Sequence, residues 1–348
     1  MSKQTTQERV LLPSNVLPQT YHIHLSPNFS TFKFKGIESV DLIVSKKSDK
    51  NSVTLHALDM DILAHSVVLV RSKKGSASEQ EDFQVLNITS NAEEETYTFE
   101  FGGDAFEVGE KLQLRLEFIG NIRDGAAGFY QLKYTNMNGE TKYGGSTQFE
   151  AVDARKAFPC FDEPALKAVF NMQLTVPSYQ IALSNMPIME QLHIDGDETT
   201  RMDCNPENKF TRFTYVPSPR MSSYLVCFVV GEFDCLETET STGIKVRVWT
   251  PLGKKMQGTF ALETAKNTLE FYHKFFQIGY PLPKLDLIAI SNMGGAMENW
   301  GLITFRDRAL ICDFQHASIT QKMLILVMIT HEIGHQWFGN LVTMQWWS

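Results

Sequence analysis

Alternating apolar and polar positions mark the first two-thirds of the chain as β-structure. The alternation is clearest in residues 40–44, 97–101, 112–118 and 170–176. A period of two with one apolar face is typical of a half-buried antiparallel strand. The stretch from Tyr224 to Val230 is apolar throughout, which predicts a strand buried on both faces. Because no long helical period precedes about residue 255, the sequence predicts an all-β domain of stacked antiparallel sheets.

Beyond about residue 253 the pattern changes to a helical one. Apolar residues recur there every three or four positions, at Ala261, Ala265, Leu269, Tyr272 and Phe276. This spacing predicts one buried helix face. We expect Pro281 and Pro283 to end this helix. Residues 285–290 and 301–305 are then expected to form two further strands.

A second helix is predicted from Ser318 to about Phe338. Ser318 as N-cap and Gln321 three residues later form a candidate capping box. The first half of this helix is apolar on nearly every side, so we expect a buried central helix. The sequence therefore divides into an all-β domain over 1–237 and an α+β domain over 238–348.

The composition is that of an ordinary globular protein and excludes several other classes of protein. The 348 residues are 43% hydrophobic and 21% charged, which excludes a wholly disordered, collagen-like or coiled-coil chain. Lys and Arg number 32 against 40 Asp and Glu, a formal charge of −8 that argues against a nucleic-acid partner. The length favours two domains.

Two features suggest where the protein resides. The segment Met1–Arg9 lacks the apolar core of a signal peptide, and the apolar run Met323–Ile329 is too short to span a membrane. We therefore expect no membrane anchor and a cytoplasmic protein. The five cysteines (Cys160, Cys204, Cys227, Cys235 and Cys312) form no motif, so they are expected to be free thiols.

The predicted second helix carries His331-Glu-Ile-Gly-His335. Residues i and i+4 share a helix face, so both imidazoles can bind one zinc ion. Glu332 lies beside that face and can take a proton from a water on the metal. The alternative is a structural histidine pair, which would bury polar groups in an apolar helix without partners.

Two further segments carry carboxylates in loops. Gly295-Ala-Met-Glu-Asn299 follows a predicted strand and places Glu298 after a glycine turn. Thr147-Gln-Phe-Glu150 is followed by a charged stretch over 153–164. Taken alone, each would be an ordinary turn or charged loop at a strand end.

Together these motifs resemble the zinc aminopeptidases of the aminopeptidase N type. The resemblance rests on Gly295–Asn299, the following Trp300-Gly-Leu302, and His331-Glu-Ile-Gly-His-Gln-Trp-Phe-Gly-Asn340. Leu11–Pro18 and the stretch over 153–164 are most similar to the cytosolic, puromycin-sensitive branch. The resemblance runs from about residue 9 to the last residue. It implies a saddle-like all-β N-terminal domain followed by a thermolysin-like catalytic domain.

The resemblance also implies roles for particular residues. His331 and His335 would hold one Zn²⁺ per chain, with Glu332 as the general base. Glu298, partnered by Glu150, would bind the free α-ammonium of a peptide, which allows cleavage only at the first peptide bond. The remaining substrate contacts would be Gly295, Ala296, Met297 and Asn299, with Met297 near the first side chain.

The family's third zinc ligand is a Glu that would fall beyond Ser348, and its catalytic Tyr lies farther downstream. The sequence therefore resembles an N-terminal fragment, and we expect poor zinc binding and doubtful activity from these residues alone. Two readings stay open: an aminopeptidase, or an inactive fragment acting as a binding or regulatory chain. A thermolysin-like endopeptidase would share the zinc motif but would not explain Glu150 or Gly295–Asn299.

Overall fold

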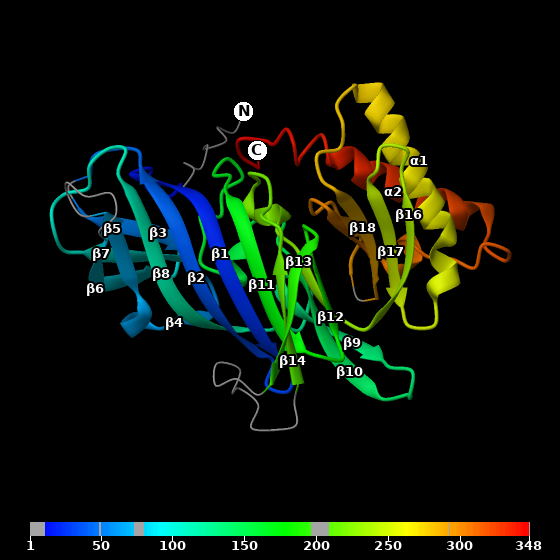
Figure 1. Ribbon diagram of the computed structural model, residues 1–348, viewed down its shortest axis with the longest axis horizontal. Helices are drawn as coiled ribbons and strands as arrows, with labels where there is room; N and C mark the ends of the chain where they lie inside the picture. The colour runs from blue at the N-terminus through cyan, green and yellow to red at the C-terminus, as the bar shows by residue number, and fades with distance from the viewer. Residues whose placement is uncertain (1–10, 49, 73–79, 196–208, 292, 348) are drawn as a thin grey trace, which may run out of the picture.

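The computed structural model describes residues 11–48, 50–72, 80–195, 209–291 and 293–347. Expectations for Met1–Arg9 and Cys204 lie outside these residues. The described chain forms three β-sheets and two α-helices, with both helices at one end of the molecule (Figure 1). The absence of α-helix before Thr259 in the described residues confirms the predicted all-β first part.

The largest sheet has eleven strands and contains every alternating segment that the sequence singled out. In sheet order the strands are β13 (Ile188–Asp195), β14 (Lys209–Tyr215), β11 (Val169–Pro177), β1 (Val16–Asn28), β2 (Lys33–Val44), β8 (Lys111–Asn121), β5 (Val68–Ser72), β6 (Gln80–Asn91), β7 (Thr96–Phe101) and β3 (Ser52–His56), with β4 (Met60–Ile62) beside β8. In β8 the residues Leu112, Leu114, Leu116 and Phe118 are all buried, as the alternation predicts.

One pairing differs from the expected antiparallel arrangement. β1 and β11 are parallel, with Tyr21 opposite Phe170 and Leu25 opposite Leu174. A parallel pair needs a long crossover, and here most of the β domain forms it. Local alternation carries no information about strand direction, so this detail could not follow from the pattern.

A second sheet of four strands packs on the first. Its order is β12 (Ile181–Ser184), β15 (Phe228–Gly231), β10 (Thr141–Gln148) and β9 (Gly128–Thr135). The ring of Phe129 lies 5.3 Å from that of Phe34 in the large sheet and 4.8 Å from that of Phe228, so aromatic side chains fill the space between the sheets.

The predicted strand over residues 224–230 is shorter than expected. Residues 223–225 form a 3₁₀ turn, and the strand β15 begins only at Phe228, although the whole run is buried. The cause is Asn185, whose side-chain amide accepts from the Cys227 N–H and donates to the Leu225 carbonyl. A side chain thus replaces the neighbouring strand at this point.

The third sheet belongs to the second part of the chain. Its order is β16 (Phe233–Glu239), β17 (Lys245–Pro251), β18 (Lys284–Ile290), β20 (Leu302–Arg306) and β19 (Ala296–Met297). The helices α1 (Thr259–Phe276) and α2 (Ile319–His335) pack against each other beside it. β16 begins at Phe233 and so spans the predicted domain boundary between residues 237 and 238. The boundary itself remains a prediction.

The end of α1 and the start of α2 both differ in detail from the expectation. α1 stops at Phe276 because Gln277 adopts a left-handed conformation with φ of 54°, before either proline is reached. At the start of α2 the Ser318 hydroxyl accepts from the Gln321 N–H at 3.1 Å, which confirms the N-cap. The Gln321 side chain donates to the Arg308 carbonyl instead of returning to Ser318, so the reciprocal half of the capping box is wrong.

The expectation that α2 is a buried central helix does not hold among the described residues. Only Ile325, Ile329, Glu332 and Ile333 are buried, on the face toward the sheet and α1. Met323 and Val327 on the other side are each 52% exposed. Within the described residues that side has no packing partner. In the part of the chain that the structure describes, no helix is long and apolar enough to cross a membrane.

Candidate active site

The two motif histidines meet at the C-terminal end of α2. Their Nε2 atoms are 3.1 Å apart, and the two rings are nearly perpendicular, at 87°. His335 Nδ1 lies 2.9 Å from the Phe338 carbonyl oxygen. That carbonyl can only accept, so it fixes the proton on Nδ1 and leaves the lone pair of Nε2 directed toward His331.

This arrangement fits a metal ion. Two nitrogens bound tetrahedrally to one zinc at 2.0–2.1 Å would lie about 3.3 Å apart, close to the observed separation. A backbone carbonyl on the outer nitrogen of a ligating histidine is the usual orienting partner. The described residues contain no group of three or more His, Cys, Asp or Glu side chains placed to hold a metal. They therefore offer two ligands of a zinc site and no third.

Three carboxylates face this end of α2. Glu332 is buried, and its Oε2 atom has no hydrogen-bond partner among the described residues. Burial, followed by the charges of Glu298 and Glu150, raises the pKa of Glu332 to about 8. Desolvation and the nearby Glu298 charge likewise raise the pKa of Glu150. The Glu298 Oε1 atom lies 4.0 Å from His335 Nδ1. The residues singled out from three separate motifs therefore gather at one place.

The strand β19 lies at the open edge of its sheet. Met297 pairs with Thr304 of β20, and nothing in the described chain pairs with the opposite edge of β19. Gly295 is exposed and Ala296 half-buried, as substrate contacts would be. Met297 is fully buried in the core, and its proximity to the first substrate side chain stays a prediction.

Three other side chains at this site had no role assigned from the sequence. The side-chain amides of Gln336 and Asn340 both donate to the Glu298 carbonyl, and the Tyr224 hydroxyl donates to the Gly339 carbonyl at 3.2 Å. Burial and the charges of Glu298 and Glu150 raise the pKa of Tyr224, which therefore stays a neutral donor. Asn299 is also buried, and its amide lies within its own loop, 3.4 Å from the Met297 carbonyl.

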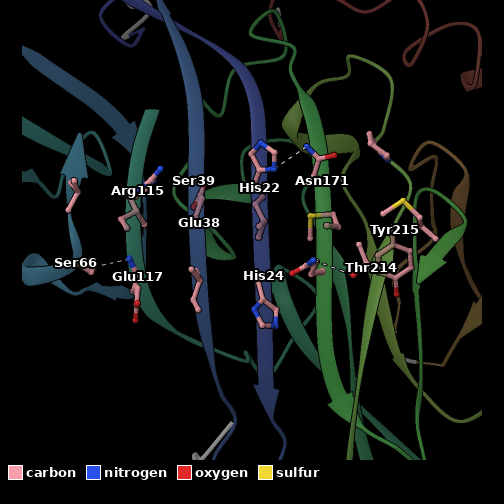
Figure 2. A pocket seen from close by; sticks show the side chains of 18 of the residues that line it. His22, His24, Glu38, Ser39, Ser66, Arg115, Glu117, Asn171, Thr214 and Tyr215 are labelled. Atoms are coloured by element: carbon pink, nitrogen blue, oxygen red, sulfur yellow. Dashed lines mark hydrogen bonds between the residues drawn. The ribbon is translucent and has the colours of Figure 1, made fainter. Parts of the chain in front are cut away.

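A separate cavity of about 750 Å³ lies on the solvent-facing side of the eleven-stranded sheet (Figure 2). Its lining includes His22, His24, Arg115 and Glu117 from the central strands. His22 Nδ1 lies 3.3 Å from the Asn171 amide nitrogen, and the side chains mostly pair with neighbours along the sheet. None of the site residues predicted from the sequence lines this cavity, so it is not the candidate active site.

Comparison with known proteins agrees with the gathered motifs. Residues 17–225 match the peptidase M1 N-terminal domain, and residues 260–348 match the peptidase family M1 domain. The chain belongs to peptidase family M1. Its two family M1 segments coincide with the β domain and with the part that carries α1 and α2.

Among relatives in family M1, the chain is 40% identical over 338 residues to "Aminopeptidase M1" of Arabidopsis thaliana. It is 38% identical over 343 residues to "Puromycin-sensitive aminopeptidase" of Caenorhabditis elegans, and 39% identical over 343 residues to "Alanine/arginine aminopeptidase" of Saccharomyces cerevisiae. These alignments cover 97%, 97% and 98% of this chain but only 36%, 33% and 37% of the relatives. The chain thus spans about a third of the length of these family M1 relatives.

Proposed function

We propose that the protein is a zinc-dependent aminopeptidase that hydrolyses the first peptide bond of peptides with a free N-terminus. The observation that supports this most is the gathering of Glu298, Glu150 and Glu332 around the end of α2, beside the paired imidazoles of His331 and His335. The three relatives compared above all carry the word aminopeptidase in their names.

The metal site would use His331 and His335 as two of its ligands. A zinc ion bound there supplies Lewis-acid polarisation of the substrate carbonyl and lowers the pKa of the attacking water. The unpartnered Oε2 of buried Glu332 is available to that water. Glu332 would take the proton from the water and pass it to the departing amine.

The substrate would be held by its charge and by its backbone. An α-amine has a reference pKa of about 7.7–8.0, and two carboxylates beside it keep it protonated. Glu298 and Glu150 would provide these carboxylates and so fix where the peptide begins. The open edge of β19, at Gly295 and Ala296, would pair with the extended peptide backbone. Met297, buried next to Ala296 in the same strand, would lie near the first substrate side chain.

The test uses two matched substrates and purified protein long enough to supply a third zinc ligand, because residues 1–348 alone are expected to bind zinc poorly. We expect chelator-sensitive hydrolysis of leucine or lysine anilide with a free amine, one zinc ion per active chain, and no hydrolysis of the same anilides after N-acetylation. Equal turnover of acetylated and free substrates would contradict the carboxylate anchor. Protein that takes up no zinc when zinc is supplied, and that shows no turnover, would favour a binding or regulatory chain. Fractionation of the cells before purification would test the predicted cytoplasmic location.

A further inference from the structure

The backbone carbonyl of Glu298 accepts two side-chain hydrogen bonds. Gln336 Nε2 donates to it at 2.9 Å, and Asn340 Nδ2 donates to it at the same distance. Both amide side chains are fully buried, and they come from the turn in which α2 ends. A carbonyl oxygen has two lone pairs, so this one is saturated. We call these two side chains the amide clasp.

The amide clasp joins two functional segments of the proposed site. Gln336 directly follows His335, and Asn340 donates its backbone N–H to the His335 carbonyl at 3.1 Å. Glu298, on the other side, carries the carboxylate proposed to bind the substrate ammonium. The amide clasp therefore connects the main chain beside a proposed metal ligand to the main chain of the proposed anchor.

The side chain of Asn340 makes few other hydrogen bonds among the described residues. Its Oδ1 atom is buried and has no hydrogen-bond partner among the described residues, so its donated bond to Glu298 is its one side-chain bond there. Gln336 also accepts from the Gly301 N–H through Oε1 at 3.4 Å, which secures the far end of the same loop. Leaving one buried amide oxygen unpaired is costly, so the position of Asn340 serves the Glu298 carbonyl rather than general packing.

The rest of the loop is held by Asn185 from the β domain and by Lys284 from β18. Asn185 Nδ2 donates to the Trp300 carbonyl at 2.9 Å, and Lys284 Nζ donates to the Gly301 carbonyl at 2.8 Å. At Gly301, with φ of 82°, a Cβ atom would lie 2.3 Å from the Asn185 carbonyl oxygen. The loop thus has no room to move toward the β domain, and the amide clasp limits its movement at Glu298.

We propose that Gln336 and Asn340 are positioning residues that set the distance between the ammonium anchor and the metal histidines, and so fix cleavage after the first residue. This inference rests on the proposed function. A bound peptide is held at its ammonium by Glu298 and reacts at a carbonyl near His331 and His335. A displacement of about 1 Å between the two segments is enough to lower the rate by about 10²-fold.

The test compares Gln336→Met and Asn340→Leu, which keep the approximate side-chain size and remove the donated hydrogen bonds. Gln180→Met is the matched control, because Gln180 is buried, donates to the Tyr143 carbonyl at 2.7 Å and belongs to the β domain. We expect hydrogen exchange at the amides of Gly301 and Leu302 to accelerate at least about tenfold in both clasp variants and to stay unchanged in the control. This measurement needs neither zinc nor turnover.

The kinetic arm uses the same proteins with peptides that have a free N-terminus. We expect KM to rise about tenfold or more in the clasp variants, with release of a dipeptide beside the single residue, while zinc content stays that of the wild type. Unchanged hydrogen exchange would overturn the clasp whatever the activity. Faster exchange with unchanged KM and unchanged cleavage position would overturn its role in fixing the cleaved bond. A wild-type protein that is inactive on all free-amine substrates would instead overturn the proposed function itself.

Discussion

Glu332 is adjacent to His331 in the sequence but faces different surroundings. The imidazole of His331 is exposed, whereas Glu332 is 5% exposed with one carboxylate oxygen unpartnered. We therefore predict that, in protein long enough to complete the zinc site, Glu332→Gln keeps bound zinc and lowers kcat by about 10²–10⁴, because it removes a general base without touching a ligand. Metal analysis and initial rates on the same preparation check this. A variant with the wild-type rate, or one that has lost its zinc, would contradict the role assigned to Glu332.

His56 is a buried residue of the β domain whose proton uptake depends on folding. Its Nδ1 atom accepts from the Asp162 N–H at 3.3 Å, and burial with the charge of Arg155 lowers its pKa to about 3. Below about pH 6.5 the unfolded chain binds a proton that the folded chain does not, so stability falls as the pH decreases, by up to about 1.4 kcal/mol per pH unit. We predict that His56→Asn, which keeps an acceptor, weakens this dependence between about pH 6.5 and pH 5. Urea titrations of wild type, His56→Asn and the exposed-site control His65→Asn measure it, and equal slopes in all three would contradict it.

At the scale of elements, α2 offers a matched pair of positions on opposite faces. Ile329 is fully buried, whereas Val327 is 52% exposed. We predict that Ile329→Ala lowers the free energy of unfolding by about 2–5 kcal/mol and Val327→Ala by less than about 0.5 kcal/mol. Both replacements remove a β-branched residue from the same helix, so the gain in helix propensity nearly cancels in the comparison. Chemical denaturation measures the two free energies of unfolding. Similar losses in both variants would show that both faces of α2 are packed in solution.

The elements themselves were largely predictable, because alternation in β8 and β11 and the helical spacing in α1 are strong local signals. What the sequence could not supply depends on distant partners. The burial of α2 depends on which elements pack against it. Its residues are apolar on nearly every side, so the pattern does not show which face is covered. Asn185 shortens β15 from 40 residues away, through the Leu225 carbonyl and Cys227 N–H.

The candidate site shows the same division. His331, Glu332 and His335 follow from helical spacing, since their mutual geometry is local. Gln336 and Asn340 belong to the segment that carries the resemblance but received no role, because an amide at a helix end resembles any other polar residue until its partner is known. That partner, the Glu298 carbonyl, is 38 and 42 positions away. The burial of Met297 depends on the pairing of β19 with β20, which the sequence pattern does not orient.

At the scale of the whole molecule, Lys284 connects the two parts of the chain. Its ammonium is buried and meets the Ser184 carbonyl at 2.7 Å, the Gly301 carbonyl at 2.8 Å and Asp286 Oδ2 at 2.7 Å, so all three of its protons have acceptors. Removing one member of a buried ion pair usually costs about 3–5 kcal/mol. We predict a loss of this size in Lys284→Met, with earlier protease cleavage between the β domain and the helical part.

The control for Lys284 is Lys245→Met, at a lysine whose exposed pair with Glu237 spans 3.3 Å. Such exposed pairs contribute about 0–1 kcal/mol. Thermal unfolding and limited proteolysis of the two variants measure the difference. Equal stabilities would mean that Asp286 is satisfied by Arg247 alone and that Lys284 does not connect the domains.

The parallel pairing of β1 with β11 determines when the large sheet can be completed during protein synthesis. About 140 residues separate the end of β1 from the start of β11. Ribosomes add roughly 5–20 residues per second, so the N–H and C=O groups on that side of β1 wait on the order of ten seconds for their partner. β2 follows at once and covers the other side. During this interval the nascent chain presents a long strand edge of the kind that other chains can join, and among the described strands of the β domain β1 waits longest for a partner.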